Sequence, residues 1–235
     1  MKTQKAEIGI LCWEAGQVPR GLVQLESLVG NSTNPDSYAF PVRFCRVKGA
    51  NIHTILENPS REVLQTMIAE AKAMVEDGVR AITTSCGFNA IFQEELAEAV
   101  DVPVFTSSLL QVPFVQKIVG RKSEVAILTA KAAALKPEHL AAAGISRTDN
   151  LHIHGLEGCP QWSKIFTSPD EDMDLEAVRK EIVGVALDAL RARPRTGAFV
   201  LECTDLPPFA EEIRNETGLP VFDFITLVNY AYASL

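Results

Sequence analysis

Two cysteines occupy matching places in the two halves of the sequence. Cys86 follows the strand-like segment 81–85, Cys203 follows the strand-like segment 198–202, and a helical pattern begins within a few residues of each. Ligands bind at the carboxyl ends of parallel strands in α/β folds. One thiolate and one thiol on opposite sides of a bound molecule can remove a proton from one face of a carbon atom and deliver one to the other face. The sequence therefore predicts that Cys86 and Cys203 form an acid–base pair in a shared cleft.

An internal repeat supports this pairing. A shift of 117 residues places Cys86 on Cys203 and the triplet 103–105 on the triplet 220–222. Over residues 7–11 and 81–105 the two halves share 11 identities in 30 positions, where average composition gives roughly 2 by chance. Shared α/β patterning explains the apolar matches but not the cysteine and the triplet together. We interpret the chain as a duplication.

Short apolar runs alternate with helical patterns along the chain. Strands are expected at 8–11, 42–47, 81–84, 102–106, 125–129, 151–154, 198–202 and 219–223, and helices at 60–77, 89–100, 137–143, 175–190 and 207–216. This alternation predicts an α/β fold with parallel sheets and right-handed crossovers.

Two pseudo-symmetric Rossmann-like lobes are therefore expected, with the active site in the cleft between them. Residues 1–107 with 217–235 are assigned to the N-terminal lobe and residues 108–216 to the C-terminal lobe. Residues 30–37 and 161–174 are interpreted as loops.

Composition excludes several function classes. The 30 Asp and Glu residues outnumber the 22 Lys and Arg residues, so the formal net charge is -8 and a nucleic-acid partner is not expected. No apolar run approaches the length of a membrane span, and the run 8–13 is too short for a secretory signal. Five cysteines without a CxxC motif indicate a reduced, cytoplasmic protein.

Cofactor and metal motifs are also missing from the sequence. Neither a GxGxxG segment after a strand nor a Walker-type loop occurs, so a nucleotide cofactor is not expected. His152 and His154 would lie on one face of a strand, but no third ligand follows at matching spacing. We therefore expect no metal.

The segments around the two cysteines resemble a known family. The sequences TSCGFN (residues 84–89) and LECTDLP (residues 201–207) are similar to motifs of the aspartate/glutamate/hydantoin racemase superfamily. The resemblance covers nearly the whole chain and implies two similar α/β halves, a cysteine pair, independence of pyridoxal phosphate and a homodimer. It also implies that Thr204 contacts a substrate carboxylate, that Asp205 partners the second thiol, and that Thr129 faces the ligand.

Two departures from the glutamate racemases concern the substrate. Those enzymes carry Asp-Ser after the first strand and Asn-Thr after the first cysteine, where this chain has Cys12-Trp13 and Gly87-Phe88. The loss of these polar groups argues against a simple acidic amino acid. Trp13 and Phe88 either make the pocket more apolar or belong to the core.

The resulting expectation is an isomerase. We expect a cofactor-independent racemase or epimerase that acts on a small carboxylate-bearing molecule, with an amino acid or a derivative as first choice. Cys86 and Cys203 are the predicted catalytic pair. The predicted substrate-binding residues are Thr84, Ser85, Gly87, Thr129, Thr204 and Asp205.

Two alternatives stay open. One is an enzyme similar to arylmalonate decarboxylase, which needs a single cysteine, or to maleate isomerase, which would use a cysteine as nucleophile. The other is a binding protein whose two lobes close on a small ligand without chemistry.

Overall fold

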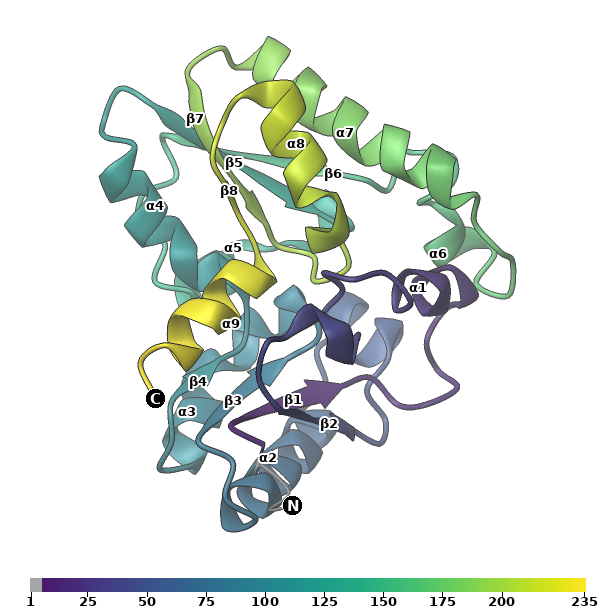
Figure 1. Ribbon diagram of the computed structural model, residues 1–235, viewed down its shortest axis with the longest axis vertical. Helices are drawn as coiled ribbons and strands as arrows, with labels where there is room; N and C mark the ends of the chain where they lie inside the picture. The colour runs from purple at the N-terminus through teal and green to yellow at the C-terminus, as the bar shows by residue number, and fades with distance from the viewer. Residues whose placement is uncertain (1–5) are drawn as a thin grey trace.

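The computed structural model describes residues 6–235 as two four-stranded parallel sheets with flanking helices. The first sheet has the order β2-β1-β3-β4 and the second the equivalent order β6-β5-β7-β8 (Figure 1). The first contains β1 (Ile8–Cys12), β2 (Val42–Arg46), β3 (Ala81–Thr84) and β4 (Val104–Phe105). The second contains β5 (Glu124–Thr129), β6 (Leu151–Gly155), β7 (Thr196–Leu201) and β8 (Val221–Phe222). The predicted fold class is confirmed.

The helices expected from periodicity cover these sheets. They are α2 (Arg61–Glu76), α3 (Gln93–Ala99), α5 (Pro137–Ala142), α7 (Leu175–Ala192) and α8 (Ala210–Thr217). Local sequence sets the ends of α2: the Ser60 side chain accepts a hydrogen bond from the Val63 backbone N–H, and Gly78 follows the helix with φ 96°. A positive φ strongly favours glycine. The segments that lead into α3 and α8 are 3-10 turns, Gly87–Phe92 and Pro207–Phe209.

Four short helices were not expected from the sequence: α1 (Arg20–Leu25), α4 (Val112–Ile118), α6 (Lys164–Thr167) and α9 (Phe224–Tyr232). They have too few turns for a clear 3.6-residue pattern. The predicted loop at 161–174 contains α6.

Helices α4 and α9 each follow the last strand of one sheet and pack on the other half. Phe224 and Val228 of α9 lie in one apolar cluster with Ile8, Ile10 and Phe105 of the first sheet. Helix α4 contacts β5, and its Gln116 side chain donates to the backbone carbonyl of Arg147 and to the side-chain oxygen of Asn150, both 2.9 Å. The two halves therefore exchange their last helices. Strand β8 pairs with β7 in the second sheet, and the lobe boundaries given above stay a prediction.

A second connection joins the halves through α1 and α6, which lie side by side in Figure 1. The Arg20 guanidinium contacts Asp172 at 2.5 Å, and the Arg20 backbone N–H donates to the Pro169 carbonyl at 2.7 Å. The Gln24 side chain accepts from the Met173 backbone N–H at 2.7 Å. These contacts hold the segment after α6 against the first half.

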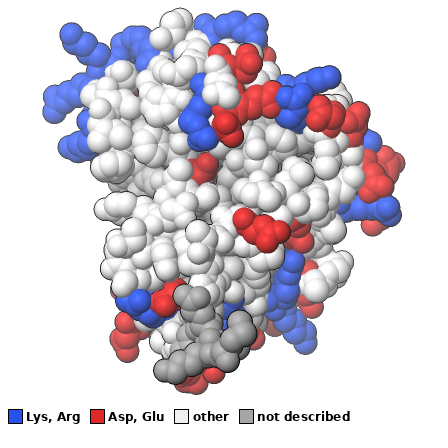
Figure 2. All heavy atoms as spheres, viewed as in Figure 1, with Lys and Arg blue, Asp and Glu red and all other residues white. Residues whose placement is uncertain are grey.

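Charged side chains of both signs lie on the face shown in Figure 2, and several basic groups gather at the upper left of that view. None of the helices that the structure describes is long and apolar enough to cross a membrane.

Candidate active site

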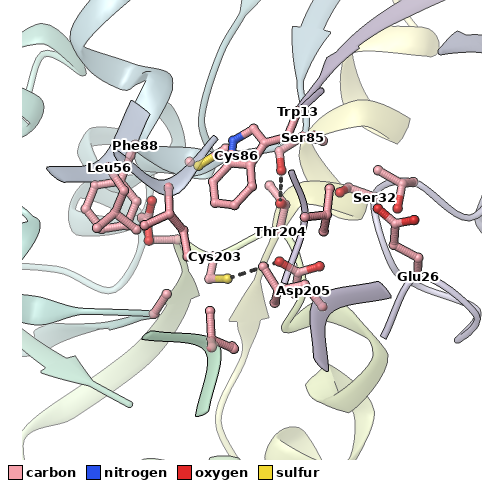
Figure 3. Close-up of a pocket in the computed structure, with 18 of the residues that line it drawn as sticks. Trp13, Glu26, Ser32, Leu56, Ser85, Cys86, Phe88, Cys203, Thr204 and Asp205 are labelled. Atoms are coloured by element: carbon pink, nitrogen blue, oxygen red, sulfur yellow. Dashed lines mark hydrogen bonds between the residues drawn. The ribbon is translucent and has the colours of Figure 1, made fainter. Parts of the chain in front are cut away.

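A pocket lies where the carboxyl ends of the two sheets meet, and both predicted cysteines line it (Figure 3). The space between the lining residues, including the part that is open to solvent, is about 590 Å³. Cys86 reaches it from the end of β3 and Cys203 from the end of β7. The duplicated strand ends therefore bring one thiol from each half into one cavity.

Cys86 is buried at the start of the turn Gly87–Phe92. Burial raises the pKa of its thiol, and the nearby Glu202 carboxylate raises it further. The backbone N–H of Phe88 and the indole N–H of Trp13 act in the opposite direction. The indole N–H has no acceptor at bonding distance among residues 6–235. These two N–H groups partly offset the rise in the pKa of the Cys86 thiol.

Cys203 lies against the carboxylate of Asp205. Its Sγ donates to Asp205 Oδ2 at 3.7 Å. Burial raises the pKa of the Cys203 thiol well above its usual value, and the charges of Asp205 and Glu202 add to this. Asp205 also accepts a hydrogen bond from Asn31 at 2.8 Å, while burial raises the Asp205 pKa to about 6. At neutral pH this arrangement favours a protonated Cys203 beside an ionised Asp205.

Four of the six predicted substrate-binding residues line the pocket: Ser85, Gly87, Thr204 and Asp205. The Thr204 hydroxyl donates to the Ser85 backbone carbonyl at 2.6 Å, so its proton is already engaged. Asp205 binds Asn31 and Cys203.

The other two predicted contacts, Thr84 and Thr129, do not line the pocket. The Thr84 hydroxyl contacts the carbonyls of Thr106 and Cys86 at 2.8 and 3.0 Å. Thr129 donates to Glu202 Oε2 at 2.6 Å. Both are fully buried at the ends of their strands. They support the loops and side chains that form the site rather than a ligand.

Several residues that line the pocket were not predicted from the sequence, or were given two alternative roles. Trp13 and Phe88 both line the pocket and also belong to the apolar core beside it, so both alternatives given for them apply. Arg46 and Glu26 line it as an ion pair at 3.2 Å, and buried Ser32 has an unpartnered hydroxyl among the described residues.

Glu202 also lines the pocket and was not among the residues predicted from the sequence. Its position directly before Cys203, in an otherwise apolar strand, was the available signal, but the repeat aligns it with Ser85 and so gave no matching carboxylate.

The two histidines of β6 bind each other rather than forming part of a metal centre. His152 Nδ1 and His154 Nε2 are 2.7 Å apart, and His152 Nε2 lies 3.0 Å from the Thr196 hydroxyl. Within residues 6–235 no group of three or more His, Cys, Asp or Glu side chains has metal-binding geometry.

Sequence comparison places the chain in a family. It is 31% identical over 220 residues to the dimethylsulfoniopropionate lyase of Durusdinium sp. clade D, covering 89% of this chain and 72% of that protein. The chain belongs to the dimethylsulfoniopropionate lyase family. Dimethylsulfoniopropionate lyase 3 of Emiliania huxleyi is also 31% identical over 217 residues, which are 88% of this chain but only 56% of that relative. No family model matches the sequence.

Solved structures agree with the fold. Allantoin racemase from Pseudomonas fluorescens superposes with a TM-score of 0.63 at 16% identity, covering 96% of this chain and 89% of that one. Arylmalonate decarboxylase gives a TM-score of 0.57 at 16% identity, covering 97% and 91%. This family member therefore has the fold of the aspartate/glutamate/hydantoin racemase superfamily, as the motifs around the cysteines predicted.

The predicted reaction class is wrong. We expected a racemase or epimerase, but the curated relatives at 31% identity are lyases. The isomerase prediction came from the fold and from the paired thiols of this chain, and neither of them determines the reaction.

Proposed function

We propose that this protein is a lyase that cleaves dimethylsulfoniopropionate, or a close sulfonium carboxylate, into dimethyl sulfide and acrylate. A base removes a proton from the carbon next to the carboxylate, a carbon–carbon double bond forms, and the carbon–sulfur bond breaks with its electron pair on sulfur. The zwitterionic substrate gives neutral dimethyl sulfide, the acrylate anion and one proton, so charge and atoms balance. Family membership supports the reaction class.

The observation that carries the proposal is the order of groups across the pocket. The free hydroxyl of Ser32 is a donor for a carboxylate, and Arg46 adds a positive charge that it shares with Glu26. Phe88 and Leu56 lie at the opposite side in Figure 3, next to the ring of Trp13. A methylated sulfonium is a cation with an apolar surface, and aromatic faces attract such cations.

The thiols lie between these two ends. Bound in this orientation, a three-carbon substrate has its acidic carbon beside Cys86 and Cys203. Cys86 is the proposed base because two N–H groups favour its thiolate, whereas Cys203 is held as a thiol by Asp205. Thiol-based proton transfer of this kind is general acid–base catalysis.

Two earlier expectations stay proposals. The five cysteines are free thiols, which supports a reducing, cytoplasmic location. A homodimer is retained only from the resemblance stated above.

The test is direct. Purified protein is incubated with dimethylsulfoniopropionate, dimethyl sulfide is measured by gas chromatography, and acrylate is measured by NMR. Equal amounts of both products are expected. Dimethylsulfonioacetate is the matched control, because it lacks the second carbon that a double bond requires and should give neither product. Absence of dimethyl sulfide from the longer substrate at high protein concentration would overturn the proposal.

A further inference from the structure

We infer that Glu202 is a third acid–base group of this pocket, which accepts the proton of the Cys86 thiol before the elimination and releases it to solvent afterwards. The inference rests on the proposed function for the identity of the substrate. It adds a residue that neither the paired cysteines nor the family resemblance indicated.

The placement of Glu202 distinguishes it from a structural carboxylate. It follows β7, lines the pocket and is fully buried. Oε2 accepts the hydrogen bond from Thr129, but Oε1 has no hydrogen-bond partner in the described part of the chain. Buried polar atoms in proteins are nearly always hydrogen-bonded. One oxygen is thus anchored, while the other is available to a proton or a ligand.

The opposite wall of the pocket is shaped to admit this carboxylate. A Cβ atom added at Gly87, next to Cys86, would lie 2.3 Å from Glu202 Oε1 and 2.2 Å from the Glu202 backbone oxygen. Only glycine leaves room for such close contact between the two halves. The loop that carries Cys86 therefore packs directly on the carboxylate.

Burial, more than charge, brings the pKa of Glu202 close to neutral pH. The titratable groups that face it are Cys86, from the end of β3, and Cys203 and Asp205, which follow it in the chain. Burial raises the Glu202 pKa to about 8, the Thr129 hydrogen bond opposes this, and the Asp205 charge adds to it. A general base is most effective when it titrates near the working pH.

The proton balance is simple. Cys86 thiol and Glu202 carboxylate become Cys86 thiolate and Glu202 carboxylic acid, with no change in total charge. The thiolate then takes the substrate proton as dimethyl sulfide leaves, which restores the thiol. Glu202 finally releases its proton to solvent, and this is the one proton that the overall reaction produces.

A competing role for Glu202 is to bind the sulfonium by charge alone. Removal of the carboxylate would then raise KM and leave kcat nearly unchanged, since only uniform binding is lost. The proton-transfer role instead predicts a loss in kcat.

The kinetic test compares Glu202→Gln with Glu124→Gln. Glu124 is also a buried carboxylate, but it pairs with Arg195 outside the pocket. Glu202→Gln should lower kcat by about 10²–10⁴-fold with little change in KM. The increase in kcat as the pH approaches about 8, where Glu202 loses its proton, should disappear. Glu124→Gln should keep the profile. Normal kcat in Glu202→Gln, or an effect on KM alone, overturns the inference.

A second variant tests the same group without removing it. Thr129→Val deletes the hydrogen bond that stabilises the carboxylate, so the Glu202 pKa rises. The limb of the pH–kcat profile in which kcat increases with pH therefore moves to higher pH. An unmoved limb in folded Thr129→Val contradicts the assignment even if Glu202→Gln does not fold.

An alkylation assay needs no substrate and so separates the two proposals. Cys86 is alkylated with iodoacetamide at pH 6–10 and followed by mass spectrometry. In the unmodified protein the rate should level off above about pH 8, because Glu202 and Cys86 then share one proton. In Glu202→Gln it should continue to rise about tenfold per pH unit until the thiol itself titrates. Identical profiles overturn the Glu202 inference, whereas missing dimethyl sulfide with distinct profiles overturns only the substrate.

Discussion

The hydroxyl of Thr204, in the second half of the chain, donates a 2.6 Å hydrogen bond to the backbone carbonyl of Ser85, in the first half. Each residue is the immediate neighbour of a pocket cysteine. One hydrogen bond therefore fixes the relative position of the two loops that carry the thiols. Small displacements of catalytic groups are costly in rate.

Thr204→Val should impair catalysis through this link. The substitution leaves the half-buried Ser85 carbonyl without its donor, which costs about 1 kcal/mol of unfolding free energy. We expect a lower urea midpoint and a fall in kcat for dimethyl sulfide release. Thr204→Ser keeps the hydroxyl and is the control. A full loss of kcat in Thr204→Ser as well would show that the methyl group, not the hydrogen bond, is required.

Replacement of either pocket thiol should abolish elimination. Serine keeps the shape but is a far weaker acid, so Cys86→Ser and Cys203→Ser should each reduce kcat by about 10²–10⁴-fold. Cys45→Ser is the matched control, because Cys45 lies on β2 outside the pocket and donates to Glu70 at 3.2 Å, a bond that serine can also make. Dimethyl sulfide release measures all three. Unaltered turnover in Cys86→Ser would transfer the role of base to another group.

Thr84→Val should affect stability more than substrate binding. Thr84 contacts two backbone carbonyls and does not line the pocket. Loss of its donor should lower the unfolding free energy by about 1–3 kcal/mol, while KM for dimethylsulfoniopropionate stays near the original value. Chemical denaturation and steady-state kinetics on the same preparation decide this. A large rise in KM with unchanged stability would restore Thr84 as a substrate contact.

The pH dependence of stability provides a test of Glu202 that involves no catalysis. Burial raises its pKa from 4.5 to about 8 in the folded protein. The contribution of Glu202 to the free energy of unfolding is fully present below pH 4.5 and is lost as the pH rises towards 8, because only the unfolded state releases the proton in this pH range. Glutamine does not titrate. Glu202→Gln should therefore gain stability relative to the unmodified protein between pH 4.5 and 8, by at most about 1.4 kcal/mol per pH unit.

Thermal unfolding of both proteins at several pH values measures this difference. Asp205, whose pKa burial also raises, is present in both and cancels. A difference in stability that does not change with pH would mean that Glu202 is ionised in the folded state throughout.

The sequence predicted the position of the thiols because the duplication repeats a whole strand–cysteine–helix unit, and such a unit has one geometry in a parallel sheet. The sequence did not predict the role of Glu202, because Gly87 and Thr129, which lie against its side chain, are more than 70 residues away in the chain. Thr84 and Thr129 were assigned to the ligand because both end strands. Their side chains turn to nearby carbonyl and carboxylate acceptors instead, and only the folded backbone determines that direction.

The reaction class could not be predicted from the thiols for a chemical reason. Racemisation and this elimination begin in the same way, with removal of a proton next to a carboxylate. Whether a proton returns or a neighbouring bond breaks depends on the leaving group that the substrate carries. The protein contributes to that choice through the groups that recognise the substrate, and the motifs around the cysteines did not determine the part played by pocket residues such as Trp13 and Phe88.

The exchange of α4 and α9 has a consequence for how the chain folds. Either half expressed alone would expose the apolar surface that the other half's last helix covers, including Ile8 and Phe105 for the first half. Such a fragment could bury that surface only by associating with a second fragment that swaps its terminal helix in return. Two separate copies of such a half could exchange their last helices in the same way, and joining them in one chain turns that intermolecular exchange into an intramolecular one that is independent of protein concentration.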